Sequence, residues 1–347
     1  MQYKELITKH LEKYSEMQAL DILKLIYQSV LGPGHFSIDE ISSLNYLKSE
    51  LPNSDNNNSN LEYIINYYRV NLNLIKANTL ELDTFNKLFC LSQNRELSDE
   101  KFISIINSLA EDFPAYDLKG ELLKYLENRK PFSHSKVFNN LYSPHYRLIK
   151  EELIKFLPVF IKIDNLLKTK KNPIILIDGN CASGKSYLSS IIEKVYDISL
   201  IKADDFFLVK EGKSLERLNE IGGNIDYERF ALEVSANLNK PSKFSYNKYS
   251  CQKGALDGLV DVDNSKIRVI EGSYSKNPKM QITADLNIFL TLEGKTQLER
   301  LEKRNPHLVS RFISEWIPKE NSYFETLNIA KDFDLIINTS NTISDIN

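Results

Sequence analysis

The stretch that decides the fold reads Gly179-Asn180-Cys181-Ala182-Ser183-Gly184-Lys185-Ser186. It fits G-x-x-x-x-G-K-[ST], the pattern of a phosphate-binding P-loop. Glycine lets the backbone come close to a ligand, so that successive N–H groups can point at its phosphates. The pattern predicts that these eight residues bind a nucleoside triphosphate. Lys185 would reach the β- and γ-phosphates, and the Ser186 hydroxyl would hold Mg²⁺.

The segments on either side of this loop fit the same interpretation. The apolar run 174–177 predicts a short buried strand, and residues 187–194 predict a helix. The positive end of that helix would face the phosphates. The alternative is an accidental glycine turn, which this strand and helix argue against. We therefore expect ATP and Mg²⁺ as cofactors.

Composition, length and net charge limit the class of protein to which this chain can belong. The chain has 347 residues, of which 42% are hydrophobic and 26% charged, and its net charge is −3. These values are typical of a globular protein, and the length favours two domains. Neither half of the chain has the basic excess of a nucleic-acid binder, so we expect no nucleic-acid partner.

The cysteines and the first residues of the chain indicate in which cellular compartment the protein works. Cys90, Cys181 and Cys251 are isolated, which argues against a disulfide framework or a structural zinc site and suits a reducing cytosol. The first residues lack an apolar signal core, and no apolar run approaches the ~18 residues that span a bilayer. We expect a cytoplasmic protein with no membrane partner. Within the P-loop, Cys181 is either a thiolate favoured by the helix N-terminus or a small residue that merely fits.

The first half of the chain predicts helices. Apolar residues recur at three- and four-residue spacing over 20–30, 41–47, 61–75, 80–91 and 102–109. Gly32-Pro33-Gly34 would end the first of these helices. Strand signals are scarce before residue 170. We therefore predict a separate, mostly α-helical domain over residues 1–168.

The pattern changes in the second half. Short runs rich in strand-forming residues occur at 174–177, 198–201, 267–270, 286–292 and 335–337, and helical segments separate them. This alternation predicts an α/β fold with a five-stranded parallel sheet flanked by helices. We assign it to residues 169–347, with the boundary in the polar stretch 168–172.

Carboxylates follow two of the predicted strands. Asp204 and Asp205 come after the second strand, and Glu271 ends the third. In a parallel sheet the carboxyl ends of the strands line the ligand crevice. Asp204, Glu271 and Ser186 would then hold Mg²⁺, and one carboxylate would accept a proton from an acceptor hydroxyl. The alternative for each Asp is a helix N-cap.

A basic stripe follows the fourth predicted strand. Arg300, Lys303 and Arg304 recur at helical spacing within residues 297–304. They either form a solvated helix face, with Glu299 and Lys303 as an i,i+4 pair, or a lid whose arginines close on the triphosphate.

Several stretches of the second half resemble one family. Residues 173–338 are similar to the uridine kinase family of P-loop kinases, and more closely to small bacterial uridine kinase-like proteins. The stretches that carry the resemblance are Ile177-Asp178-Gly179 before the P-loop, Asp204-Asp205-Phe206-Phe207, residues 224–230, Ile270-Glu271-Gly272-Ser273-Tyr274, residues 300–305 and residues 312–324.

The resemblance implies a role for each matching residue. Asp204 matches the usual candidate for activating the acceptor hydroxyl, and Glu271 matches an acidic residue near the metal and the acceptor. Arg300 and Arg304 match the lid that contacts ATP, with Arg304 in a catalytic role.

Four further residues are expected to bind the acceptor molecule. Asp226 matches a residue that hydrogen-bonds sugar hydroxyls, and Tyr246 and Tyr249 lie where family members contact the acceptor. We add Asp205 to this acceptor-binding set. The residues flanking the two tyrosines depart from the nucleoside kinase pattern, so the acceptor itself is not assigned.

The first half contains a second candidate site. Gln28, His35 and His134 lie in turn-forming contexts and could share a polar pocket or a metal site, although no H-x-x-x-H spacing supports a metal. The alternative is that these histidines are capping and turn residues. Their surroundings resemble an uncharacterised bacterial domain, to which we attach no function.

Together these patterns predict a phosphotransferase with an alcohol group as acceptor. It would move the γ-phosphoryl group of ATP to a hydroxyl of a small nucleoside- or sugar-like molecule. Two alternatives remain: a nucleotide-dependent switch whose first half binds a partner, and a bifunctional protein whose first half processes the same metabolite. The absence of an N-K-x-D motif argues against a GTPase. The sequence does not determine the oligomeric state.

Overall fold

The computed structural model describes residues 1–33, 39–51, 61–77, 80–93, 99–130 and 132–340. The chain divides into two compact units, Met1–Ile154 and Lys155–Asn347. The division precedes the predicted boundary at 168, because helix α10 (Leu157–Leu167) belongs to the second unit. Its residue Asp164 accepts a 2.8 Å hydrogen bond from the hydroxyl of Tyr196 in that unit.

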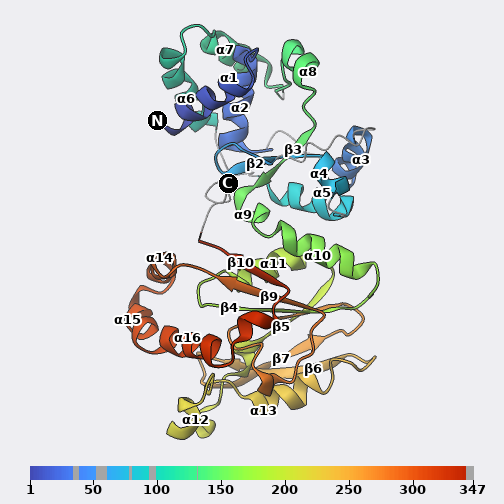
Figure 1. The fold of residues 1–347 in the computed structure, drawn as a ribbon, viewed down its shortest axis with the longest axis vertical. Coiled ribbons are helices and arrows are strands. Elements are labelled where there is room, and N and C mark those ends of the chain that lie inside the picture. The colour runs from blue at the N-terminus through green and yellow to red at the C-terminus, as the bar shows by residue number, and fades with distance from the viewer. Residues whose placement is uncertain (34–38, 52–60, 78–79, 94–98, 131, 341–347) are drawn as a thin grey trace. The chain divides into compact units, whose positions relative to one another are not determined.

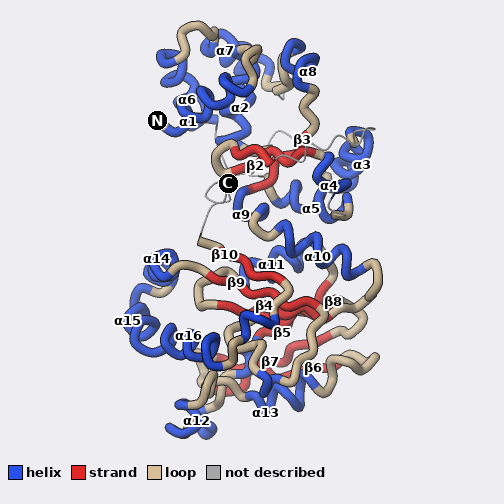
Figure 2. Tube along the Cα trace, viewed as in Figure 1, coloured by secondary structure: helices blue, strands red, loops and turns tan. Residues whose placement is uncertain are grey.

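The first unit combines helices with one small sheet (Figures 1 and 2). Its elements in chain order are α1 (Gln2–Lys13), α2 (Ala19–Leu31), α3 (Glu40–Glu50), β1 (Leu61–Tyr63), β2 (Tyr67–Asn71), α4 (Asn73–Ala77), α5 (Leu82–Leu91), α6 (Asp99–Asp112), α7 (Leu118–Asn128), α8 (Lys136–Tyr142), β3 (Tyr146–Lys150) and α9 (Glu151–Ile154). Helix α2 is apolar on nearly all sides and is buried among α1, α6 and α7, where it forms the centre of the core. Gly32 caps α2, as predicted.

The three-stranded antiparallel sheet β1-β2-β3 corrects the prediction of an all-helical pattern over 61–75. Only α4 is helical in that stretch. Ile65 and Asn66 both adopt φ near 63° and turn the chain between β1 and β2. Two successive positive φ values give the tight turn that joins antiparallel strands. The aromatic and β-branched residues of β2 then pack on the pleated sheet rather than along a helix.

The second unit is the predicted α/β fold (Figure 2). Its main elements are α10, β4 (Ile174–Gly179), α11 (Lys185–Val195), β5 (Ile198–Lys202), α12 (Leu215–Asn219), α13 (Tyr227–Phe230), β6 (Phe244–Ser250), β7 (Ala255–Val262), β8 (Ile267–Glu271), β9 (Leu286–Thr291), α14 (Gly294–Arg304), α15 (Val309–Arg311), α16 (Ile317–Thr326) and β10 (Leu335–Asn338). Five parallel strands pair in the order β10-β9-β4-β8-β5, so the predicted sheet is confirmed.

Both faces of this sheet are covered, with α10 and α11 on one side and α13 and α16 on the other (Figure 2). The central strand β4 is buried along its whole length, as expected for a continuous apolar run in a parallel sheet. The antiparallel hairpin β6–β7 was not predicted from the sequence. Of the helices in the described part of the chain, none is both long and apolar enough to cross a bilayer.

Candidate functional site

The P-loop lies between the carboxyl end of β4 and the start of α11. Gly179 has φ 140°, and a Cβ atom there would lie 2.0 Å from the carbonyl oxygen of Leu290. Only glycine therefore lets the loop leave β4 so close to β9. Gly184 caps α11 with φ 99°, and a Cβ there would meet open space. The strand, the loop and the helix are arranged as the motif predicts.

Lys185 and Ser186 occupy the first turn of α11. The Lys185 ammonium donates hydrogen bonds to the carbonyl oxygens of Gly179 (2.8 Å) and Asn180 (2.9 Å) and to the hydroxyl of Ser273 (3.2 Å). The Ser186 hydroxyl donates to the Glu271 carboxylate over 3.2 Å. Sheet pairing of β4 with β8 brings Glu271, at the end of β8, to this helix.

Asp204 lies in a short 3-10 turn directly after β5 and completes the cluster. Burial raises the pKa of Glu271, and the charge of Asp204 raises it further while Lys185 lowers it. Partial desolvation also raises the pKa of Asp204, although part of the residue stays exposed, and the charge of Lys185 again opposes this shift. Because these charges shift the pKa values of Glu271 and Asp204, the two carboxylates and the Lys185 ammonium lie close enough to interact electrostatically.

The donor set of this cluster fits Mg²⁺. In the described ranges, no group of three or more His, Cys, Asp or Glu side chains could hold a metal by itself. Ser186, Glu271 and Asp204 offer one hydroxyl and two carboxylates at the phosphate-binding loop. Mg²⁺ is commonly held in this way, with one or two carboxylates and with waters and substrate phosphates as the remaining ligands.

Arg300 and Arg304 have different surroundings. Arg300 donates to the carbonyl oxygens of Ala182 (3.1 Å) and Thr339 (2.7 Å) and to the Thr339 hydroxyl (3.0 Å), so it braces the P-loop against the end of β10. Arg304 is exposed, and its charge lowers the pKa of Asp204. The two predicted lid arginines therefore differ. Arg300 holds the P-loop through hydrogen bonds, whereas Arg304 is exposed and lowers the pKa of Asp204.

The predicted acceptor residues are only partly brought together. Tyr246 is buried and donates a 2.9 Å hydrogen bond to the Asp205 carboxylate, so it can act on an acceptor only through Asp205. Asp226 accepts from the backbone N–H of Arg229 (3.0 Å) and caps α13, which is the helix-cap alternative. Tyr249 packs against Phe207, with ring centroids 6.1 Å apart, and is not paired with the other three.

Two residues of the site were missed as functional candidates. Glu320, buried on α16, accepts hydrogen bonds from the backbone N–H of Cys181 (2.8 Å) and from the Ser273 hydroxyl (2.7 Å). Arg229 donates to the carbonyl oxygen of Asp205 (2.7 Å) and lies over the ring of Phe206. Both act across the fold, and no local sequence signal identifies either of them.

Cys181 is not a thiolate in this structure. Burial and the nearby Glu320 charge raise the pKa of its thiol to about 12. Its sulfur lies 3.1 Å from the side-chain amide nitrogen of Gln297. The alternative of a small residue that fits the loop is therefore favoured.

Of the three residues predicted for a pocket in the first unit, Gln28 and His134 line one cavity. Gln28 and His134 are joined through the hydroxyl of Tyr146. His35 lies outside the described residues.

Comparisons with known proteins give little beyond this geometry. No protein-family model matches the chain, and no curated protein matches it. One solved structure, described as a possible uridine kinase from Bacillus stearothermophilus, is similar with 18% identity and a TM-score of 0.42. The match covers 54% of this chain and 99% of that one. At these values the likeness carries no conclusion about activity or substrate.

Proposed function

We propose that this protein is an ATP- and Mg²⁺-dependent kinase that phosphorylates a hydroxyl group of a small nucleoside- or sugar-like molecule. The observation that supports this most is the convergence of Lys185, Ser186 and Glu271 at the P-loop, with Asp204 in electrostatic reach. P-loop proteins that hydrolyse nucleotides also hold Mg²⁺ with one acidic residue beside the loop hydroxyl, so Glu271 fits either class. The second carboxylate, Asp204, is the group that can accept the proton of an acceptor hydroxyl.

The proposed chemistry is a direct in-line transfer. Lys185 and the loop N–H groups hold the triphosphate, and Mg²⁺, held by Ser186, Glu271 and Asp204, would neutralise phosphate charge. The acceptor oxygen attacks the γ-phosphorus, the bond from that phosphorus to the bridging oxygen breaks, and ADP leaves. Asp204 accepts the hydroxyl proton. A carboxylate positioned at the acceptor hydroxyl contributes to the transfer as a general base.

The arginines and the acceptor residues have distinct proposed roles. Arg304 stabilises charge that develops on the transferring group, whereas Arg300 holds the P-loop in shape for ATP. Asp205 contacts the acceptor, with its position fixed by the Tyr246 hydroxyl and by Arg229. Asp226 and Tyr249 border this region in the proposal.

The proposal is tested by identifying the phosphorylated product. The full chain is incubated with ATP, Mg²⁺ and a pooled metabolite extract, and new species heavier by one phosphoryl group are found by mass spectrometry. A Lys185→Met variant in the same extract is the control. A kinase gives a product that depends on the wild-type P-loop, and the reverse test is purified product plus ADP regenerating ATP.

A nucleotide-dependent switch makes a different prediction. ATP consumption by a kinase rises when the acceptor is added, while consumption by a switch responds to a protein partner and not to small hydroxyl compounds. ATP hydrolysis that no fraction of the metabolite pool stimulates would favour the switch.

A further inference from the structure

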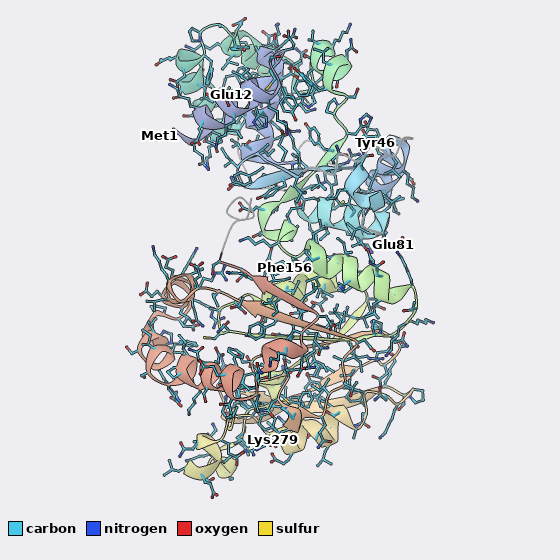
Figure 3. The ribbon with its side chains drawn as sticks, in the orientation of Figure 1. Met1, Glu12, Tyr46, Glu81, Phe156 and Lys279 are labelled. Atoms are coloured by element: carbon cyan, nitrogen blue, oxygen red, sulfur yellow. The ribbon has the colours of Figure 1, made fainter. Side chains whose placement is uncertain are left out.

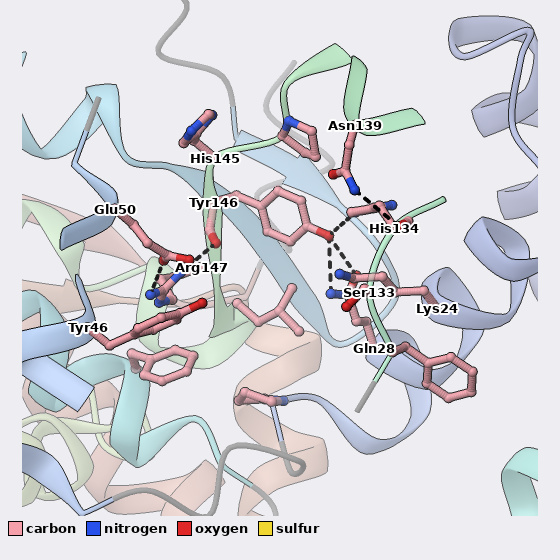
Figure 4. A pocket seen from close by; sticks show the side chains of 15 residues that line it. Lys24, Gln28, Tyr46, Glu50, Ser133, His134, Asn139, His145, Tyr146 and Arg147 are labelled. Carbon is pink, nitrogen blue, oxygen red and sulfur yellow. Dashed lines mark hydrogen bonds and ion pairs between the residues drawn. The ribbon is translucent and has the colours of Figure 1, made fainter. Parts of the chain in front are cut away.

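The first unit contains a cavity of about 420 Å³, whose lining residues all belong to that unit (Figure 4). Gln28, His134 and Arg147 are buried in its wall, whereas Ser133 and His145 are exposed at its rim. A buried polar wall with an exposed rim describes a cavity that solvent can enter. Its volume lies within the range of small-molecule sites.

The hydrogen bonds of the wall permit one consistent placement of protons. Asp21 is buried, and its carboxylate accepts from the backbone N–H of Ser135 (2.9 Å) and from His134 Nδ1 (3.0 Å). Burial lowers the pKa of His134 to about 4, so its ring is neutral at pH 7. Nδ1 therefore carries the ring proton, and Nε2 accepts from the Tyr146 hydroxyl over 2.8 Å.

The chain of hydrogen bonds continues through Gln28. Since the Tyr146 proton is donated to His134, the Tyr146 oxygen accepts from the Gln28 amide at 3.2 Å. The Gln28 carbonyl oxygen accepts from Arg69 Nε (3.1 Å) and Nη2 (2.8 Å), and Arg69 forms an ion pair with Glu62 at 3.0 Å. On the other side of the cavity, Arg147 is paired with Glu50. The wall is therefore fixed: its own arginine, Arg147, is paired with Glu50, and Arg69 behind Gln28 is paired with Glu62.

Lys24 is the exception in this wall. It lies on α2 between Asp21 and Gln28 and lines the cavity. In the part of the chain that the structure describes, its ammonium group has no hydrogen-bond or ion-pair partner. Burial and the charge of Arg69 lower the pKa of Lys24 to about 8. A partly buried ammonium group with three donors is stabilised by an anion that accepts its hydrogen bonds.

Part of the lining is aromatic. Phe89 and Phe132 are buried residues of the lining, and Tyr46 of α3 (Figure 3) is an exposed one. Aromatic rings beside one unpaired cation suit a molecule with an apolar or planar body and an anionic group.

We propose that this cavity binds a small organic anion, whose carboxylate or phosphate group accepts hydrogen bonds from Lys24 while its body packs against Phe89 and Phe132. All residues of this cavity belong to the first unit, whereas those of the proposed kinase site belong to the second.

The test uses pyridoxal 5′-phosphate, an aromatic anion with an aldehyde, on the full chain at pH 8 without ATP. The neutral Lys24 amine attacks the aldehyde carbon, a C–N bond forms and water leaves. Added borohydride then delivers hydride to the imine carbon and makes the adduct permanent. Peptide mapping by mass spectrometry gives the labelling rate of each lysine separately, so labelling of Lys185 does not interfere.

We expect Lys24 and the exposed Lys119 of the same sample both to be labelled when no competitor is present. Phenyl phosphate or benzoate, added well above its dissociation constant, should slow labelling of Lys24 by about 10-fold or more and leave Lys119 unchanged, whereas the neutral analogue benzamide should slow neither. Protection by only one of the two anions identifies phosphate or carboxylate as the preferred group.

Two results would overturn the proposal. One is no labelling of Lys24 in a sample in which Lys119 is labelled, since the cavity would then not admit an aromatic anion. The other is labelling that neither anion reduces, or that benzamide reduces equally, since then no anion site exists. Both readouts use the wild-type protein, so neither depends on the folding of a variant. A Lys24→Met variant should lose only the Lys24 adduct and keep labelling at Lys119.

Discussion

The P-loop cluster of the second unit and the cavity of the first unit are both polar, but their polar groups are satisfied in opposite ways. In the cavity, Asp21, His134, Tyr146 and Gln28 pass hydrogen bonds from one to the next, whereas Lys24 has no hydrogen-bond or ion-pair partner among the described residues. In the P-loop cluster, the charge of Asp204 raises the pKa of Glu271, and the hydrogen bonds that Lys185 donates to described residues go to neutral oxygens. A wall whose hydrogen-bonding groups bind one another can select a ligand by its shape and by the one charge of Lys24. Within the described ranges, the charged groups of the P-loop cluster are not neutralised by ion pairs with one another, and they are arranged for the ions and phosphates that come with the substrate.

The largest expected effect comes from removing the P-loop ammonium. Lys185→Met should lower kcat/KM for phosphoryl transfer by roughly 10²- to 10³-fold, because a preorganised cation at the transferring group is lost. Steady-state kinetics with the identified acceptor measure it. Lys194→Met, an exposed lysine on the same helix, is the matched control and should keep full activity. Loss of Lys24 labelling in the Lys185→Met variant would show that the P-loop site and the cavity are coupled.

The next effect separates binding from chemistry within the P-loop cluster. Asp204→Asn should reduce turnover by roughly 10²-fold or more, the scale of general base catalysis, and leave ATP affinity nearly intact. Turnover and equilibrium ATP titration are both needed. Asp205→Asn is the comparison, since Asp205 pairs with Tyr246 and should change acceptor KM more than turnover. Full turnover in Asp204→Asn would refute the assignment of the base.

The cavity should respond in stability and not in catalysis. Tyr146→Phe removes the donor to His134 Nε2 and the acceptor for the Gln28 amide, which leaves two buried polar groups unpaired. We expect the first unit to lose about 1–3 kcal/mol of stability. Hydrogen exchange of peptides from α2 and β3 reports this unit separately from the second. Tyr142→Phe, whose hydroxyl accepts one 3.3 Å bond from the backbone N–H of Glu16, should change little.

The smallest effect concerns the charge on Glu271. Its pKa is raised by burial and by Asp204, so its contribution to stability is present below the ordinary pKa of a glutamate and is lost as the pH rises through the raised value. At pH 7, without nucleotide and Mg²⁺, Glu271→Gln should therefore unfold a few degrees higher than wild type.

Thermal unfolding of the second unit between pH 4 and pH 8 measures this difference, which should shrink as the pH falls. Glu193→Gln, an exposed residue on α11, should show no such dependence. A Glu271→Gln variant that is less stable at pH 7 would mean that the Ser186 hydrogen bond outweighs the charge repulsion.

Features encoded in contiguous residues were predictable. The P-loop, its strand and its helix lie within residues 174–195, and all five parallel strands were located from short apolar runs. The reason is clearest for β4 and β8, which are buried along their whole length and leave an unbroken apolar signal, while the partly exposed edge strands β5 and β10 still consist of short apolar runs. Asp204 and Glu271 followed from the rule that strand ends of one parallel sheet meet at the same edge.

Features that depend on pairing across the chain were not predictable. The strands β1 and β2 read as helix, because their tyrosines and apolar residues also fit three- and four-residue spacing. Arg300 and Arg304 share one stripe in the sequence, yet only Arg300 reaches the P-loop carbonyls. Asp226 could not be distinguished from an acceptor ligand until its bond to the N–H of Arg229 identified it as a cap.

By itself, then, the sequence determined the parallel sheet, the triphosphate loop and the carboxylates at its edge, since each follows from local pattern and strand direction. Only the tertiary structure decided where the units divide, which arginine contacts the P-loop, and that Lys24 has no partner in the part of the chain that the structure describes. The physical reason is that hydrogen bonding and desolvation depend on neighbours in space, and residues such as Gln28, Arg69 and Tyr146 become neighbours only when α2, β2 and β3 pack together.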